Sequence, residues 1–268
     1  ADVMIPGNGI SAGLMRRLDF RLQTGCLQHF DGLMALSLNA CSDFAPHVPR
    51  ILTDVALSAE LAERLAATPE PDDDPEALFT IVYTGWLDGL RGIPLLLEAF
   101  KLLEESRYRL VITGRGELQH AVKKAANADT RITYLGYLPS HDDVVALYAR
   151  ASVLVNLYRT DSPTLRYAFP SKVLEYLATG RPVVSTCTAG MREGYADIVT
   201  LLEEETPEAL ADLLRQVESM DTDTITQRGR TAKEFMLKHK TWDRTGRHLA
   251  AFIRDVTLKA GEGTDGGG

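Results

Sequence analysis

The sequence has 268 residues, 45% of them hydrophobic, and a formal net charge of −8 at pH 7. A chain of this size can bury a full core in one or two domains. Its negative charge argues against nucleic acid as a partner, and it contains no apolar run long enough to span a membrane. It also lacks a signal peptide and has only three scattered cysteines, so we expect a reducing, cytoplasmic compartment without disulfides or a zinc site.

Residues 1–57 contain a few α/β elements that cannot form a well-covered sheet by themselves. We interpret them as the remnant of another, N-terminal domain. Since the chain starts at Ala1 without a methionine, we expect more of that domain upstream. Strands are expected at 3–5, 32–37 and 50–56, a helix at 11–28 and a short helix at 39–44.

Residues 58–77 predict a connecting helix and a linker. Ser58 is a preferred N-cap residue, so a helix is expected from there to residue 67. The run TPEPDDDPE at 68–76 is rich in proline and aspartate, which is typical of a solvated linker.

Residues 78–240 alternate strands and helices, which predicts an α/β domain with a doubly wound parallel, Rossmann-like sheet. A final amphipathic helix is expected within 241–260 and a disordered tail at 261–268. Strands are expected at 78–84, 108–113, 132–135, 151–157 and 182–186, with an edge strand at 197–202; helices are expected at 93–105, 118–126, 142–149, 170–179, 206–219 and 222–238.

The helix at 170–179 follows a strand and a polar loop, so its N-terminus lies at the carboxyl edge of the sheet, where ligands bind. Its first N–H groups, near Ser171 and Lys172, form an anion site that the lysine charge strengthens. Glu175 lies on the same helix face, and an ionised carboxylate can accept from two adjacent sugar hydroxyls. The pattern indicates a diphosphate at the helix start and a ribose one turn further in. Spacing alone leaves a solvated Lys–Glu pair as the alternative.

Two glycine-rich loops follow other strands at the same edge. In the first, GWLDGLRG, the glycines allow close approach to a ligand and Arg91 can bind phosphate through two N–H groups. The second contains Gly114 and Gly116, but Gln119 replaces the third glycine of the dinucleotide-binding fingerprint. The alternative is that these are ordinary turn residues with an exposed arginine.

Four segments, in this order and spacing, resemble the donor-binding half of GT-B-fold glycosyltransferases of family 4: GWLDGLRGIPLLLEAF, RLVITGRGEL, ITYLGYLPSHDDVVALYARASVLVNLY and YAFPSKVLEYLATGRPVVST. The resemblance covers residues 79–218. It also covers the helix within 241–260, which is similar to a terminal helix that crosses back to the first domain. It implies retaining, metal-independent transfer of a sugar from a nucleotide-sugar donor to a glycan or lipid-linked acceptor, with no cofactor. It also suggests bacterial polysaccharide assembly at the cytoplasmic side, with at most peripheral membrane contact through the missing domain.

The same resemblance implies roles for individual residues. Arg91, Ser171 and Lys172 would hold the diphosphate, with Arg91 and Lys172 as the catalytic charges, and Glu175 would bind the ribose. The remaining donor-binding positions are Gly85, Trp86, Gly114, Gly116, Tyr137 and Leu138, the last two beside the nucleobase.

Two positions depart from the common pattern of that family. Tyr167 stands where a second glutamate would contact the transferred sugar, and Trp86 stands where an arginine is usual. The Pro-Ser-Lys sequence before Glu175 is similar to a branch in which the lysine binds phosphate. The resemblance implies that residues 1–57 are a remnant of the N-terminal acceptor-side domain, because they match only its last elements, so we expect a truncated form that keeps donor binding. The alternative is a non-catalytic nucleotide-binding module of the same fold.

Overall fold

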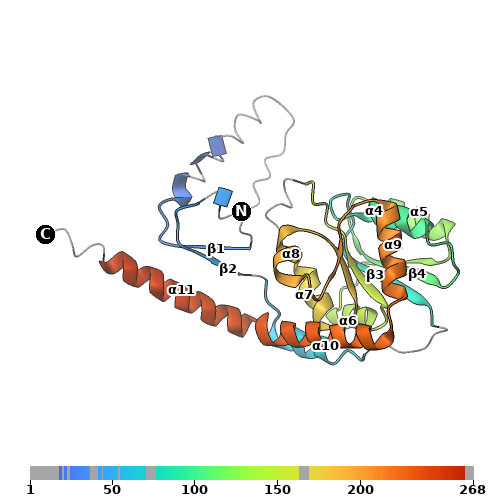
Figure 1. The fold of residues 1–268 in the computed structure, drawn as a ribbon. Helices are drawn as coiled ribbons and strands as arrows, with labels where there is room; N and C mark the ends of the chain where they lie inside the picture. The colour runs from blue at the N-terminus through green and yellow to red at the C-terminus, as the bar shows by residue number, and fades with distance from the viewer. Residues whose placement is uncertain are drawn as a thin grey trace. The chain divides into compact units, whose positions relative to one another are not determined.

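The structure is a computed structural model that describes residues 18–19, 21–22, 25–36, 42–43, 45–53, 55–70, 77–162 and 169–262 (Figure 1). The expected strand at 3–5, most of the linker, most of the tail and Tyr167 lie outside the described residues, as do parts of the helices expected at 11–28 and 39–44. Residues 261–262, expected in a disordered tail, instead form the end of the last helix. The chain divides into two compact units, Ala1–Thr53 with Thr245–Gly268, and Asp54–Arg244.

The larger unit contains a sheet of six parallel strands within the described residues, in the order β5-β4-β3-β6-β7-β8. The chain lays down β3, β4 and β5 toward one side and then returns to place β6, β7 and β8 on the other side of β3. This order confirms the doubly wound α/β fold predicted from the sequence. The strands are β3 (Phe79–Trp86), β4 (Tyr108–Arg115), β5 (Ile132–Gly136), β6 (Val153–Asn156), β7 (Val183–Thr186) and β8 (Thr200–Leu202).

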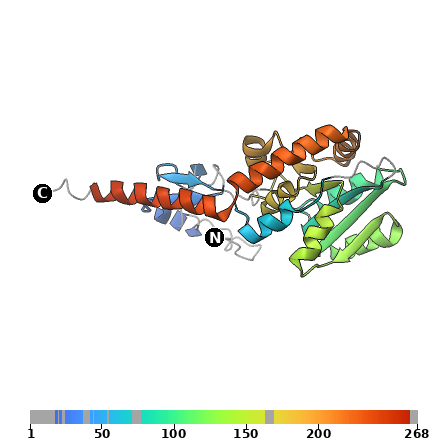
Figure 2. The ribbon, with the colours of Figure 1, turned by 90° about the horizontal axis from the view of Figure 1, so that it is seen from below.

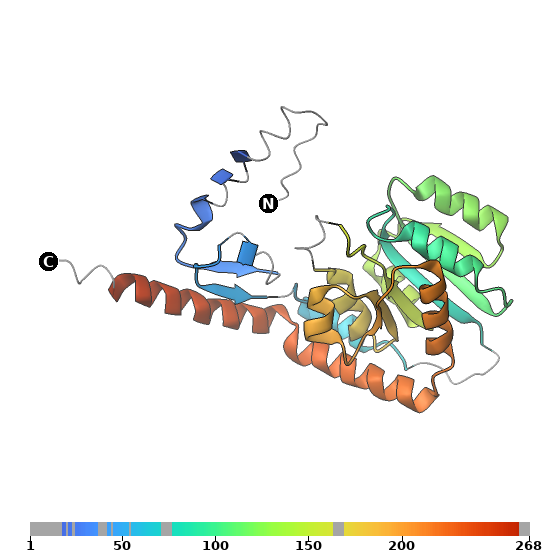
Figure 3. The same cartoon turned by 45° about the horizontal axis from the view of Figure 1, so that its top comes forward.

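Helices cover both faces of this sheet (Figures 1 and 3). One face carries α4 (Ile93–Lys101), α5 (Gln119–Ala128) and α9 (Pro207–Glu218). The other carries α3 (Ala59–Ala66), α6 (His141–Ala149), α7 (Ser171–Ala178), α8 (Ala189–Tyr195) and α10 (Thr222–His239). On that second face α3, α7 and α10 lie side by side (Figure 2).

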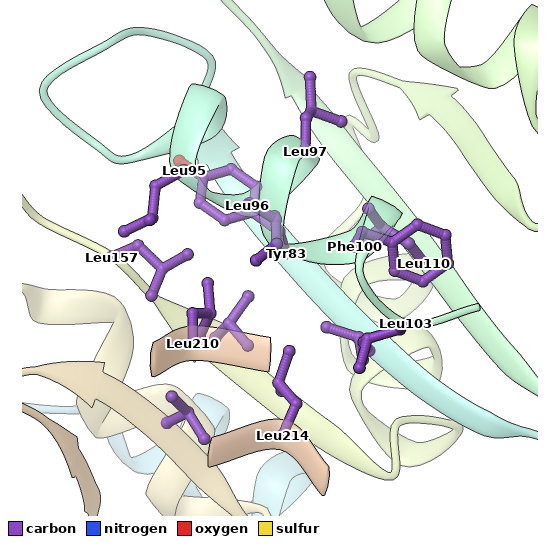
Figure 4. Packing of buried hydrophobic residues seen from close by; sticks show 14 of the residues in the cluster. Tyr83, Leu95, Leu96, Leu97, Phe100, Leu103, Leu110, Leu157, Leu210 and Leu214 are labelled. Atoms are coloured by element: carbon purple, nitrogen blue, oxygen red, sulfur yellow. The ribbon is translucent and has the colours of Figure 1, made fainter. Parts of the chain in front are cut away.

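The first face shows why the sequence folds in this way. Side chains of alternate strand residues point to one face, so the apolar runs of the strands supply both cores. Figure 4 shows Leu96 and Phe100 of α4 and Leu210 and Leu214 of α9 meeting over the sheet beside Leu110 of β4. These five side chains are fully buried. Burial of this kind stabilises by about 1.5–3 kcal/mol per large aliphatic side chain.

Helix α8 is a correction to the sequence analysis, which placed no helix between β7 and β8. Thr188 caps it, because its hydroxyl accepts from the Met191 N–H at 3.3 Å. The helix has seven residues and contains Gly190 and Gly194, which lower its intrinsic propensity, and the burial of Met191 and Tyr195 in the second core stabilises it.

Helix α3 begins as expected, with the Ser58 hydroxyl accepting from the Leu61 N–H at 3.2 Å. Residues 58–77 are expected to form a connecting segment, and in the structure Ala62 and Leu65 of α3 are buried in the second core. Just before α3, Leu57 forms a parallel bridge with Thr241, through hydrogen bonds of 2.9 Å to the Lys240 carbonyl and 3.1 Å from the Trp242 N–H. The two ends of the larger unit are therefore joined to each other.

The smaller unit contains β1 (Leu33–Ala35) and β2 (Arg50–Leu52), which pair in parallel. Most of α11 (Trp242–Glu262) belongs to it, and its Phe252 ring would lie 2.9 Å from a Cβ atom placed on Gly32. Leu18 and Leu22, expected on one side of a helix, are exposed. None of the helices in the described part of the chain is long and apolar enough to cross a membrane.

Candidate functional site

The carboxyl edge of the sheet has its switch point between β3 and β6, where strand order reverses. The loops that leave these two strands pack directly on each other. Gly92 has a φ of +72°, and a Cβ atom there would lie 2.3 Å from the Leu157 carbonyl oxygen. The Arg159 N–H donates to the Leu90 carbonyl at 2.8 Å. The two loops therefore contact each other at the position where ligands bind to such sheets.

Gly114 and Gly116 lie where the backbone at the end of β4 packs closely against the backbone at the end of β3. A Cβ atom on Gly114 would lie 1.7 Å from the Gly85 carbonyl oxygen, and one on Gly116 would lie 2.3 Å from the Leu87 carbonyl oxygen. Both residues also have positive φ values, +139° and +158°. Packing of the two loops is thus a sufficient reason for both glycines, and their contact with a ligand stays a prediction.

Lys172 and Glu175 lie together at the start of α7. Lys172 Nζ is 3.8 Å from Glu175 Oε2, and both side chains are partly exposed. The N-cap residue Pro170 makes no side-chain capping hydrogen bond, and Ser171 is exposed. The first turn of α7 thus offers backbone N–H groups and an ammonium group at one place, which is the arrangement that binds anions at helix N-termini.

A group of buried hydroxyls lies beneath this pair, and the sequence analysis did not identify it. Tyr148 of α6 donates to Glu175 Oε2 at 3.0 Å and accepts from Lys172 Nζ at 3.4 Å. Its hydroxyl also lies 3.2 Å from Thr84 Oγ1, and Thr84 Oγ1 lies 3.0 Å from the Tyr176 hydroxyl. Burial, followed by the nearby Tyr176 and Glu175, raises the pKa of Tyr148 well above its usual value. Tyr148 therefore remains a hydrogen-bond donor at neutral pH.

Arg91 lies in the loop after β3 and is held by two neighbours. Its backbone N–H donates to Asp88 Oδ1 at 2.8 Å, and its guanidinium forms an ion pair with the same carboxylate. The guanidinium also lies 5.5 Å from the centre of the Tyr158 ring, in the loop after β6. Burial acts to lower the pKa of Arg91, but Tyr158 and Asp88 raise it above its usual value. The charge is therefore fixed between the two loops at the switch point.

Trp86 and Tyr137 share a neighbour that the sequence analysis did not select. Arg115 pairs in register with Trp86 across β3 and β4, and its guanidinium lies 6.0 Å from the Trp86 ring and 4.8 Å from the Tyr137 ring. Trp86, Arg115 and Tyr137 are exposed, whereas Leu138 packs on the second core. Cation–aromatic contacts thus connect the ends of β3, β4 and β5. The Arg115–Trp86 contact depends on the register of β3 and β4, which the sequence alone does not give.

The comparison with protein families matches residues 78–219, more than half of the chain, to the glycosyl transferases group 1 model. The chain belongs to this family.

Curated proteins are also similar to this chain in sequence. A protein of Escherichia coli strain K12 named as a candidate colanic acid biosynthesis glycosyltransferase, WcaL, is 26% identical over 208 residues, which cover 75% of this chain and 51% of WcaL. The chain spans about half the length of the curated relatives it matches: 51% of WcaL and 46% of a D-inositol 3-phosphate glycosyltransferase of Corynebacterium urealyticum.

Solved structures share the group 1 fold. The α,α-trehalose 6-phosphate synthase of Burkholderia multivorans has a TM-score of 0.72 at 14% identity. The match covers 96% of this chain and 66% of the synthase. The Anabaena protein HepE, solved in complex with UDP and glucose, has a TM-score of 0.69 at 14% identity, with 89% of this chain and 67% of HepE covered. These likenesses confirm the GT-B fold predicted for the larger unit.

Within this group 1 domain, the structure brings several of the predicted site residues together. Lys172 contacts Glu175 directly, Gly85 approaches Gly114, and Arg115 joins Trp86 to Tyr137. The described residues contain no group of three or more histidines, cysteines, aspartates or glutamates that could hold a metal ion.

Proposed function

We propose that the protein is a glycosyltransferase that moves a sugar from a nucleotide-sugar donor to a glycan or lipid-linked acceptor, and that the larger unit binds the donor. One observation carries this proposal. Lys172 and Glu175 lie side by side at the start of α7, at the carboxyl edge of a doubly wound sheet. The presence of UDP and glucose in HepE, a protein of the same fold, supports the proposal.

In the proposed reaction an acceptor hydroxyl forms a bond to the anomeric carbon of the sugar and gives up its proton, and the bond between that carbon and the diphosphate breaks, so that the leaving diphosphate gains negative charge. Lys172 and the N–H groups at the start of α7 stabilise that charge. Arg91 supplies a second positive charge, held in place by Asp88. Glu175 accepts hydrogen bonds from the ribose hydroxyls. Retention of configuration, independence of a metal ion and membership of family 4 are parts of this proposal that rest on the motif resemblance.

The test is calorimetric titration of the protein with UDP and GDP, using the tighter ligand for the variants. Lys172→Ala and Glu175→Ala should each weaken binding about 10- to 100-fold, because each removes a hydrogen bond that involves a charged group. The chain offers a matched control in α4, where Glu98 and Lys101 form an exposed i,i+3 pair at 2.7 Å. Lys101→Ala and Glu98→Ala should bind as the wild type does.

Equal affinities in all five proteins would refute the site and, with it, the proposed function. Should Lys101→Ala weaken binding as much as Lys172→Ala does, the effect would come from net charge alone, and the clamp at α7 would be wrong.

A further inference from the structure

The hydroxyl of Tyr148 connects three elements of the larger unit. Tyr148 belongs to α6, which lies on the same face of the sheet as α7 (Figure 1), and its side chain is fully buried. From there its hydroxyl reaches Glu175 and Lys172 on α7, and Thr84 on β3. One buried phenol therefore contacts both charged residues of the proposed donor clamp.

The hydrogen-bonding capacity of this hydroxyl is completely used by one arrangement. A phenol has one proton and two lone pairs, an ionised carboxylate only accepts and an ammonium group only donates. The Tyr148 proton therefore goes to Glu175, one lone pair accepts from Lys172, and the other accepts the Thr84 proton. A buried polar group with all its partners in place specifies a single geometry.

The charged pair needs such support. Lys172 and Glu175 are 3.8 Å apart, with side chains 36% and 25% exposed, and an i,i+3 pair of this kind is weak by itself. Long side chains also lose rotamer freedom when they bind a ligand. Contact with a rigid buried hydroxyl removes much of that freedom before the ligand arrives, which favours binding.

Packing alone does not account for the hydroxyl. The Tyr148 ring lies edge-on to the Tyr176 ring, with centres 5.2 Å apart, and a phenylalanine would make the same contact. The hydroxyl adds a polar group to a buried position, and two of its three partners are the charged side chains that open toward solvent.

We propose that Tyr148 is a positioning residue for the donor: its hydroxyl directs the Glu175 carboxylate toward the ribose and the Lys172 ammonium toward the diphosphate. This inference rests on the proposed function and adds the buried group that sets the geometry of the clamp. Thr84 fixes the hydroxyl from the sheet, so the clamp is oriented by β3 and α6 as well as by α7.

Calorimetric titration of Tyr148→Phe with the same nucleoside diphosphate tests this role. Affinity should fall about tenfold, because one hydrogen bond to charged groups is lost. Tyr176→Phe is the matched control, since the hydrogen bonds of this buried tyrosine hydroxyl go to Thr84 and not to the charged pair. Its affinity should stay within about twofold of the wild type.

A double-mutant cycle distinguishes positioning from a general loss of packing. In a Glu175→Ala background, Tyr148→Phe should cost less than about threefold, because one of the two groups that it orients is already gone. An unchanged tenfold loss in that background would mean that Tyr148 acts through the fold alone, and the inference would be wrong.

Two other outcomes separate this inference from the proposed function. Wild-type affinity in Tyr148→Phe, with weak binding in Lys172→Ala and Glu175→Ala, overturns the positioning role and leaves the function intact. Wild-type affinity in all three variants overturns the function itself. Thr84→Val replaces Tyr148→Phe as the test variant if circular dichroism shows the latter unfolded; a several-fold loss is then expected, and wild-type affinity overturns the inference.

Discussion

Replacing Gly114 by alanine should destabilise the larger unit strongly, for two reasons that the structure separates. Gly114 has a φ of +139°, and the new Cβ atom would lie 1.7 Å from the Gly85 carbonyl oxygen. Strain at a φ of this kind costs about 1–3 kcal/mol, and forcing an extra carbon into a packed site costs about 1–3 kcal/mol more. The expected loss is therefore about 2–6 kcal/mol.

Two other glycines provide the controls. Gly136 has a φ of +73° but no atom within 4 Å of its Cβ position, so Gly136→Ala should cost only the backbone strain of about 1–2 kcal/mol. Gly89 has neither a positive φ nor a neighbour within 4 Å, so Gly89→Ala should be neutral or stabilise by about 0.4–1 kcal/mol. From most to least stable, the expected order of the variants is then Gly89→Ala, Gly136→Ala, Gly114→Ala.

Urea unfolding followed by circular dichroism measures all three free energies. Thermal unfolding checks the order, at about 2–4 °C per kcal/mol for a unit of this size. A Gly114→Ala protein no less stable than Gly136→Ala would refute the reasoning, since it would mean that the ends of β3 and β4 can separate at little cost.

The remaining predictions concern the core and the response to pH. Leu96→Ala should lower the free energy of unfolding in urea by about 2–5 kcal/mol, because Leu96 is completely buried, whereas the partly exposed Leu102→Ala should cost much less. Alkaline pH should destabilise the fold, because burial raises the pKa values of Tyr83, Tyr108, Tyr148 and Tyr176 above the usual value near 10. The unfolded chain then releases these protons first, so stability is full below about pH 10 and declines as pH rises through the higher pKa values. Urea titrations at pH 8 and pH 10.5 measure this decline, and Tyr176→Phe should show less of it; equal stability at both values would contradict the prediction.

The strands of the larger unit could be predicted because parallel strands covered by helices on both faces are rich in apolar residues. The expected 108–113, 132–135 and 182–186 differ from β4, β5 and β7 by only one or two residues at an end. Helix α8 could not be predicted, because its stability comes from the burial of Met191 and Tyr195 and its local sequence contains two glycines.

The candidate site was predictable where it depends on one short segment. Lys172 and Glu175 lie one helical turn apart, so their proximity follows from spacing alone. Tyr148 and Arg115 were not identified, because their contacts join residues far apart in the chain: Tyr148 reaches Thr84 across 64 positions, and Arg115 meets Trp86 through strand register. A tyrosine that orients a carboxylate and a tyrosine that fills a core have the same local sequence signal.

The bridge between Leu57 and Thr241 has a consequence for handling the larger unit as a separate piece. Backbone hydrogen bonds of 2.9 and 3.1 Å hold its first and last segments next to each other. A segment cut at residues 55 and 244 would thus begin and end at neighbouring points. Its ends can be joined by a short peptide, and new ends can be opened between α4 and β4, where residues 104–107 are exposed and lie far along the chain from α7. Such a circular permutant would keep every contact of the carboxyl edge while changing the order in which the strands are synthesised.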